Sequence, residues 1–279
     1  MEVPREASDE GLTPWIQQLG SEAEAERLRA QAALVKQGQA AVLPLIAAYA
    51  GVTDVQVKER IVALLGLIGG DAVDALIQQL VERNPGRQEC ARQALPRIVA
   101  SLPTLLALPK THPNLNSVAQ AILHELAANL GYPSLDQLLT DYKSLTQQTK
   151  PLTSTQLRYE LRVKRVLEVL EEARECFNSD LYSQTILTCD WVIQQLLTAI
   201  LEFFHRDLGN DANKLPIVIS TLRNIGVRIR AEKELRWLRI LRNDLRYELK
   251  RPTKREANQA LRVARYFTQE VKGLLSLRF

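Results

Sequence analysis

A chain of 279 residues in which 46% of the side chains are hydrophobic and 24% are charged has a globular composition, which excludes an intrinsically disordered protein. The net charge of +4 is divided unevenly along the chain. Before residue 156 there are 13 Lys and Arg against 16 Asp and Glu, a net of −3, and from residue 156 onward 23 face 16, a net of +7. Two domains of opposite net charge are therefore predicted.

The N-terminal sequence MEVPREASDEG is acidic, unlike a secretory signal, and the longest uninterrupted apolar run, residues 45–52, has about eight residues. We therefore expect a cytoplasmic protein with no membrane-spanning segment. The cysteines are odd in number and include no Cys-x-x-Cys pair, which favours a reducing compartment: Cys90, Cys176 and Cys189. The histidines share no metal-ligand spacing, so neither a metal nor a cofactor is predicted: His112, His124 and His205.

The first half of the chain contains an internal repeat. Hydrophobic residues and a glycine of the segment 33–46 recur 31 residues later, in the segment 64–77. A period near 30 residues with two apolar helical stripes in each unit is typical of an α-solenoid. Gly69-Gly70 is expected to end the helix 58–68, and Asp71 to cap the next one. Helices at 115–130 and 134–147 are predicted to close the stack.

This part of the chain resembles HEAT repeats, in particular the short variety named after phycobilisome lyases, through the sequence VKERIVALLGLIGGDAVDALIQQL. The resemblance covers about residues 12–108 and implies a surface that binds a protein partner. A bilin-lyase-type chaperone is a distant third hypothesis, because nothing beyond the repeat supports it. We place the HEAT-like α-solenoid at residues 10–143 and a polar linker containing Pro151 at residues 144–155.

Residues 156–279 are predicted to form four long helices and one short helix, joined by brief connections. Pro252 marks the last boundary, and Thr253 with Glu256 forms the pattern of a capping box at the start of the final helix. Short connections make neighbouring helices antiparallel, so a helical bundle is expected. The predicted fold class is all-α, with an N-terminal α-solenoid followed by a C-terminal antiparallel helical bundle.

The bundle resembles a HEPN domain. The resemblance spans about residues 160–275 and rests mainly on the sequence Leu-Arg-Asn-Asp-Leu-Arg-Tyr at 241–247 and on Arg255-Glu256-Ala257 with the helix that follows. It implies an antiparallel bundle that usually dimerises, so a homodimer through the C-terminal bundle is expected. Many members of this family are metal-independent RNases, and others are non-catalytic RNA-binding or scaffolding domains.

In the catalytic members of the family, an arginine and a polar residue are followed, after three or more residues, by a histidine. Arg242 and Asn243 match the first two positions, but Tyr247 stands at the histidine position, and no histidine follows His205. Metal-free RNA cleavage needs a group that moves a proton near neutral pH, and tyrosine titrates near pH 10. The motif is therefore interpreted as degenerate, and no catalytic residue is assigned.

A basic stripe follows the helix that carries this motif. At 100° per residue its members occupy a sector about 120° wide beside a face of leucines, and acidic residues one turn away are sparse. Arg239 and Arg246 are expected to be exposed. The predicted phosphate-binding residues continue into the next helix: Arg236, Arg239, Arg242, Arg246, Lys250, Arg251, Lys254 and Arg255.

Each motif residue also has an alternative explanation. Arg242 could instead pair with a carboxylate of the bundle, such as Glu202 or Glu248, and Tyr247 could pack in the core with its hydroxyl bonded. The favoured function is a non-enzymatic scaffold or adaptor that binds a protein partner through the solenoid and RNA or a second partner through the basic bundle. The alternative is a HEPN-type metal-independent endoribonuclease or toxin that uses Arg242 with an atypical second residue.

Overall fold

The computed structural model describes the 279-residue chain except for residues 1–10, 83, 148–152, 205–213, 248–250 and 277–279. Helices make up all of its regular structure, and the described residues contain no strand, so the all-α fold class is confirmed. The chain divides into two compact units at Arg158 and Tyr159, within one long helix. Each unit is therefore described by itself.

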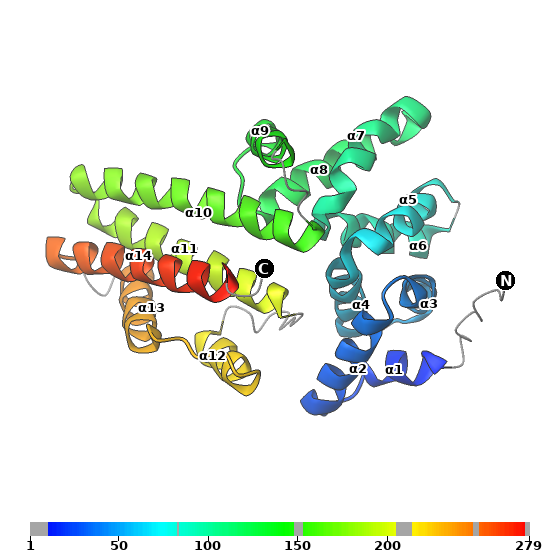
Figure 1. The fold of residues 1–279 in the computed structure, drawn as a ribbon, viewed down its shortest axis with the longest axis horizontal. Coiled ribbons are helices and arrows are strands. Elements are labelled where there is room, and N and C mark those ends of the chain that lie inside the picture. The colour runs from blue at the N-terminus through cyan, green and yellow to red at the C-terminus, as the bar shows by residue number, and fades with distance from the viewer. Residues whose placement is uncertain (1–10, 83, 148–152, 205–213, 248–250, 277–279) are drawn as a thin grey trace. The chain divides into compact units, whose positions relative to one another are not determined.

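In the first unit, consecutive helices follow one another through short connections (Figure 1). Neighbours along the chain pack together, and α3 also contacts α6. The helices predicted at 115–130 and 134–147 are present as the last two of the unit. The α-helices of this unit are α1 (Thr13–Gln18), α2 (Glu24–Gln37), α3 (Gln39–Gly51), α4 (Val55–Ile68), α5 (Val73–Val81), α6 (Pro85–Ala94), α7 (Leu102–Thr111), α8 (Asn116–Asn129) and α9 (Leu135–Thr146).

Glycines with positive φ end two of these helices. Gly38 follows α2 with φ +55°, and Gly69 follows α4 with φ +73°, a region in which a side chain would be strained. The predicted helix break at Gly69 is thus confirmed. The predicted cap at Asp71 is wrong, because a 3-10 turn at Gly69–Ala72 leads into α5 and no side chain caps that helix. Asp54 is a true cap, since it accepts bonds from two backbone amides at the start of α4.

Helices extend into the predicted linker 144–155 from both sides. Helix α9 runs to Thr146, and α10 (Ser154–Asn178) begins two residues before the predicted start of the bundle, while residues 148–152 lie outside the described part of the chain. The early start of α10 has a local cause. The Thr153 amide donates to Gln156 Oε1 at 2.9 Å, and the Gln156 amide donates to Thr153 Oγ1 at 3.2 Å, which is a capping box.

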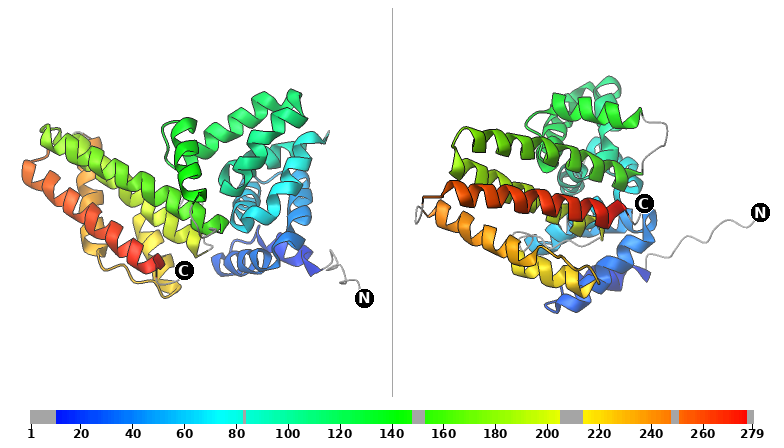
Figure 2. Two further views of the ribbon diagram at one scale, coloured as in Figure 1. Left: turned by 45° about the horizontal axis from the view of Figure 1, so that its top comes forward. Right: turned by 60° about the vertical axis from the view of Figure 1, so that its left-hand side comes forward.

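In the second unit, α10 is followed by α11 (Tyr182–Phe203), α12 (Leu215–Asn224), α13 (Glu232–Arg246) and α14 (Lys254–Ser276), which are the five predicted helices. Helix α11 is central, because it contacts α12, α13 and α14. Helices α10, α11 and α14 lie alongside one another in all views (Figures 1 and 2). The predicted capping box is confirmed: the Thr253 amide donates to Glu256 at 2.8 Å and the Glu256 amide to Thr253 at 3.3 Å.

Two stretches are long and apolar enough to cross a membrane by length and composition, Val55–Val81 and Tyr182–Phe203. The expectation that the chain has no membrane-spanning segment stays a prediction, because this criterion does not separate a span from a core helix. In the most apolar windows of these stretches, 50% and 56% of the residues are buried inside the protein. Buried core helices meet the same criterion, so their apolar character is accounted for by packing.

Candidate nucleic-acid interface

Helix α13 carries half of the predicted interface residues, and its leucines determine which way the helix faces. Leu235, Leu238 and Leu241 are buried, and α13 contacts both α11 and α14. Burial of three leucines on one side of the helix directs the opposite side to solvent. The arginines of the predicted stripe lie between these two sides, so their surroundings differ.

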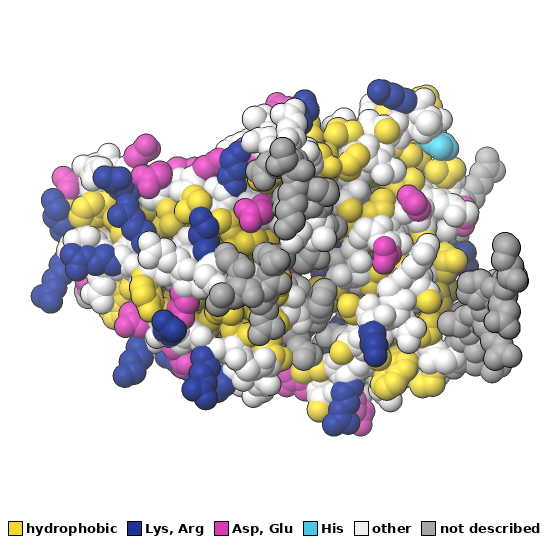
Figure 3. Space-filling model, in the orientation of Figure 1, with side chains coloured by type: hydrophobic (Ala, Val, Ile, Leu, Met, Phe, Trp, Pro, Cys, Tyr) yellow, Lys and Arg dark blue, Asp and Glu magenta, His cyan; other side chains and the backbone are white. Residues whose placement is uncertain are grey.

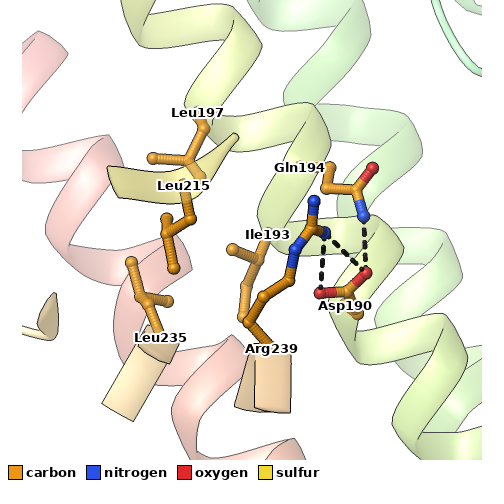
Figure 4. Close-up of a pocket in the computed structure, with 7 residues that line it drawn as sticks. All are labelled: Asp190, Ile193, Gln194, Leu197, Leu215, Leu235 and Arg239. Carbon is orange, nitrogen blue, oxygen red and sulfur yellow. Dashed lines mark hydrogen bonds and ion pairs between the residues drawn. The ribbon is translucent and has the colours of Figure 1, made fainter. Parts of the chain in front are cut away.

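Arg239 and Arg242 both form ion pairs with Asp190 of α11. Arg239 Nη1 lies 3.3 Å from Asp190 Oδ2, and Arg242 Nε lies 3.2 Å from the same oxygen. Gln194, one turn further along α11, donates to this carboxylate as well (Figure 4). One carboxylate therefore binds side chains from two helices, and we call Asp190, Arg239 and Arg242 the Asp190 cluster.

The Asp190 cluster lies in apolar surroundings. Asp190 is 5% exposed and Arg242 is 8% exposed. A small pocket, with a volume of about 10 Å³, is lined by Asp190, Gln194 and Arg239 together with four apolar side chains: Ile193, Leu197, Leu215 and Leu235 (Figure 4). Burial lowers the pKa of the Arg242 guanidinium from its ordinary value, and the Asp190 carboxylate opposes this change. Asp190 is therefore the group that keeps a buried arginine charge tolerable.

Arg236 is also paired, in this case within its own helix. Its Nη2 lies 2.9 Å from Glu232 Oε1, and Arg223 of α12 lies 2.9 Å from the other oxygen of the same carboxylate. The hydrogen bond from Arg236 lowers the pKa of the Glu232 carboxyl. The prediction that acidic residues one turn away are sparse was therefore wrong for Arg236, whereas Arg239 and Arg242 find their carboxylate on another helix. The expected exposure of Arg239 was wrong too, because the side chain turns toward Asp190.

The remaining predicted cations, apart from Lys250, lie in solvent. Lys250 is outside the described residues. Lys254 lies with its Nζ 5.8 Å from the centre of the Phe177 ring of α10, within the range of a cation–π contact. In Figure 3, Lys and Arg side chains gather at the end of the bundle where α14 begins. We call the four exposed side chains of this region the terminal basic cluster: Arg246, Arg251, Lys254 and Arg255.

The three residues of the family motif lie in different surroundings. Arg242 is buried and faces Asp190, whereas Asn243 is exposed and Tyr247 is 75% exposed just after α13. The alternative in which Tyr247 packs in the core is therefore wrong. The alternative in which Arg242 pairs with a bundle carboxylate is correct in kind but not in partner. Glu202 binds Arg162 at 3.3 Å instead, and Glu248 lies outside the described residues.

Sequence reasoning missed Asp190, although the sequence contained a signal. Asp190 is the only charged residue between positions 183 and 201, within an otherwise apolar or neutral helix. A carboxylate in such a helix is costly unless a cation faces it. The sequence therefore indicates that Asp190 has a cationic partner. It does not indicate which helix supplies the partner.

Other kinds of reactive site find little support in the described part of the chain. There, no group of three or more His, Cys, Asp or Glu side chains could hold a metal ion. Burial raises the pKa of the thiols of Cys90 and Cys189 to about 12 in each case. Both thiols are therefore protonated at neutral pH and poor nucleophiles.

Comparison with known proteins supports the predicted C-terminal domain. Residues 159–274 match the family model of the HEPN domain, and the described residues of this range lie in the second unit. The chain therefore contains a HEPN domain, formed by α10 to α14. No curated protein and no solved structure matches the chain.

We expect Asp190→Ala to lower the free energy of unfolding by about 3–5 kcal/mol, because the buried Arg242 would lose its carboxylate partner. Urea denaturation followed by circular dichroism measures this change. Glu175→Ala is the matched control, because it removes an exposed carboxylate from α10 of the same unit and should change stability by about 0.5 kcal/mol at most. Similar effects of the two substitutions would contradict a stabilising role for Asp190.

Proposed function

We propose that the protein is a non-enzymatic adaptor whose HEPN domain binds RNA and whose N-terminal helices bind a protein partner. One observation carries the RNA-binding part, namely the division of the cations into buried and exposed sets. Arg239 and Arg242 are committed to Asp190, whereas the terminal basic cluster is exposed. An exposed group of guanidinium and ammonium groups suits the phosphates of a nucleic acid backbone.

The motif residues support binding more than cleavage. Metal-free cleavage needs a proton-transferring group and a cation that stabilises charge on the scissile phosphate. Tyr247 supplies a phenol at the histidine position, and phenols titrate near pH 10. Arg242 is 8% exposed, and its guanidinium is paired with Asp190, so it is not presented to a substrate in this conformation.

A metal-independent endoribonuclease or toxin is the second candidate function. The match to the HEPN domain favours it, because many members of that family cleave RNA. The 75% exposure of Tyr247 also leaves its hydroxyl accessible to a substrate. In this case Arg242 would have to leave Asp190 before it could bind the phosphate, which makes the Asp190 cluster an obstacle to the reaction.

We infer that the helices of the first unit form HEAT-like repeats. Gly38 and Gly69, which correspond at the 31-residue period, both end a helix with a positive φ, and this equivalence supports the repeat. The unit also exposes large apolar side chains suited to contact with a protein partner: Leu43, Val55, Val81 and Leu106.

We expect the affinity for single-stranded RNA to fall steeply with salt, because each neutralised phosphate contributes about 0.7 to the logarithmic slope and four contacts give a slope near −3. Arg246→Gln with Arg251→Gln should reduce this slope by about 1.4 and weaken binding to unrelated sequences equally. Fluorescence anisotropy with a labelled RNA oligomer at several salt concentrations measures both quantities. Arg92→Gln with Lys110→Gln removes the same charge from exposed positions of the first unit and should change neither. RNA binding that ignores salt would remove phosphates from the proposed interface.

The proposed absence of catalysis predicts that labelled RNA stays intact during long incubation with the protein in EDTA-containing buffer. Gel electrophoresis of the RNA reads the result, and Arg242→Ala is the diagnostic variant. Cleavage by the wild-type protein that disappears with Arg242→Ala would establish the endoribonuclease in place of the adaptor. Cleavage that persists with Arg242→Ala would point to a contaminating nuclease.

We also propose a homodimer through the HEPN domain, with Ile240 of α13, which is 62% exposed, covered by the second copy. Light scattering of the full chain at tens of micromolar should give twice the mass of one chain, and Ile240→Glu should shift this value toward the monomer. Leu106→Glu places the same charge on an exposed apolar position of the first unit and should leave the mass unchanged. A monomeric wild-type protein would contradict the proposal.

A further inference from the structure

The outward face of α14 is basic along the length of the helix. Its exposed cations are Lys254, Arg255, Arg262, Arg265 and Lys272. At 100° per residue, the exposed residues of α14 fall in a sector about 140° wide, which also contains three amide side chains and Tyr266. Among the residues of α14 whose side chains the structure describes, no exposed one is an Asp or a Glu. We call this sector the α14 basic face.

The two acidic residues of α14 have structural bonds away from the α14 basic face. Glu256 accepts from the amide and the hydroxyl of Thr253, both at 2.8 Å, in the capping box. Glu270 accepts from the backbone amides of Arg230 and Ala231, which precede α13, the second at 3.4 Å. These carboxylates stabilise the start of α14 and its contact with the segment before α13. Because both carboxylates form these bonds, the charged side chains on the outward face of α14 are all positive.

The length of the α14 basic face indicates a polymeric ligand. Arg255 and Arg262 are two turns apart, or about 10 Å along the helix axis, and Arg265 lies about 5 Å further. One small anion cannot contact cations spread over this distance, whereas successive phosphates of a nucleic acid can. Since each basic side chain would meet a phosphate without reading a base, this contact does not depend on sequence.

Tyr266 distinguishes a nucleic acid from a lipid surface. Its side chain is 49% exposed, and it follows Arg262 by one turn and Arg265 by one residue. An aromatic ring between cations offers a platform on which an unpaired base stacks. A helix that lies on a membrane also needs a broad apolar side to enter the lipid. Among the α14 side chains that the structure describes, Tyr266 is the only large apolar one that is exposed.

We propose that single-stranded RNA lies along the α14 basic face, with phosphates bound by Arg262 and Arg265 and a base stacked on Tyr266. This inference rests on the proposed function of RNA binding, and it extends the interface from the terminal basic cluster along the outer side of the bundle. The path follows a straight helix, so the RNA segment is bound in an extended form. Double-stranded RNA would keep its bases paired and could not use Tyr266 in this way.

The test compares three variants of the full chain in binding a labelled oligouridine of about 20 nucleotides, measured by fluorescence anisotropy at several salt concentrations. Arg262→Gln with Arg265→Gln should reduce the logarithmic salt slope by about 1.4. Tyr266→Ala should weaken binding about fivefold or more and leave the slope unchanged, because stacking involves no counterion release. Arg92→Gln with Lys110→Gln is the charge-matched control and should bind as wild type. All of these positions are exposed, so thermal unfolding should show unchanged stability.

The outcomes separate this inference from the proposed function. If the wild-type protein binds RNA and the Arg246 and Arg251 variant weakens binding while the α14 variants do not, the α14 basic face is not part of the interface. If the wild-type protein binds no RNA, the proposed function and this inference both fall. Binding to vesicles of phosphatidylserine and phosphatidylcholine, without RNA binding, would reassign the α14 basic face to a lipid surface and overturn the proposal.

Discussion

The arrangement of the HEPN domain depends on one carboxylate buried on its central helix. Asp190 of α11 holds Arg239 and Arg242, which are one turn apart on α13. Because two points on α13 are tied to one point on α11, the helix cannot rotate without breaking an ion pair in apolar surroundings. Breaking such a pair costs about 3–5 kcal/mol, which is comparable to much of the stability of a small domain.

The rotation of α13 then decides which residues can meet a ligand. With Arg242 turned inward, Asn243 and Ile240 face outward, and Tyr247 lies exposed beyond the last turn. An arginine held in this way stabilises the fold, and its guanidinium cannot contact a substrate unless it leaves Asp190. Of the residues that resemble a catalytic motif, only Arg242 therefore packs in the core in this conformation, whereas Asn243 and Tyr247 are exposed.

Much of the fold follows from local sequence patterns, whereas the site does not. Hydrophobic periodicity predicted all five helices of the second unit, and the Thr-x-x-Glu pattern at Thr253 correctly marked the start of α14. These features depend on residues within one or two turns of each other. The pairing of Arg239 with Asp190 joins residues 49 positions apart, and a helical projection of α13 contains no information about α11. For the same reason, the projection led to the wrong expectation that Arg239 is exposed, because it could not show that the side chain turns to a carboxylate.

The surplus of positive charge after residue 156 understates how basic the outer surface of α14 is. Acids of this part of the chain are used in structural bonds: Asp190 within the bundle, Glu232 between Arg223 and Arg236, Glu256 in the capping box and Glu270 at backbone amides. A carboxylate that bonds a backbone amide or a buried guanidinium is oriented by that bond and contributes little screening to a remote outward face. Cations on long flexible stems have the opposite tendency, because their methylene groups cover the apolar core while the charge remains in water. Packing therefore separates the two signs of charge, and α14, with five basic and two acidic residues, has a positive outward face.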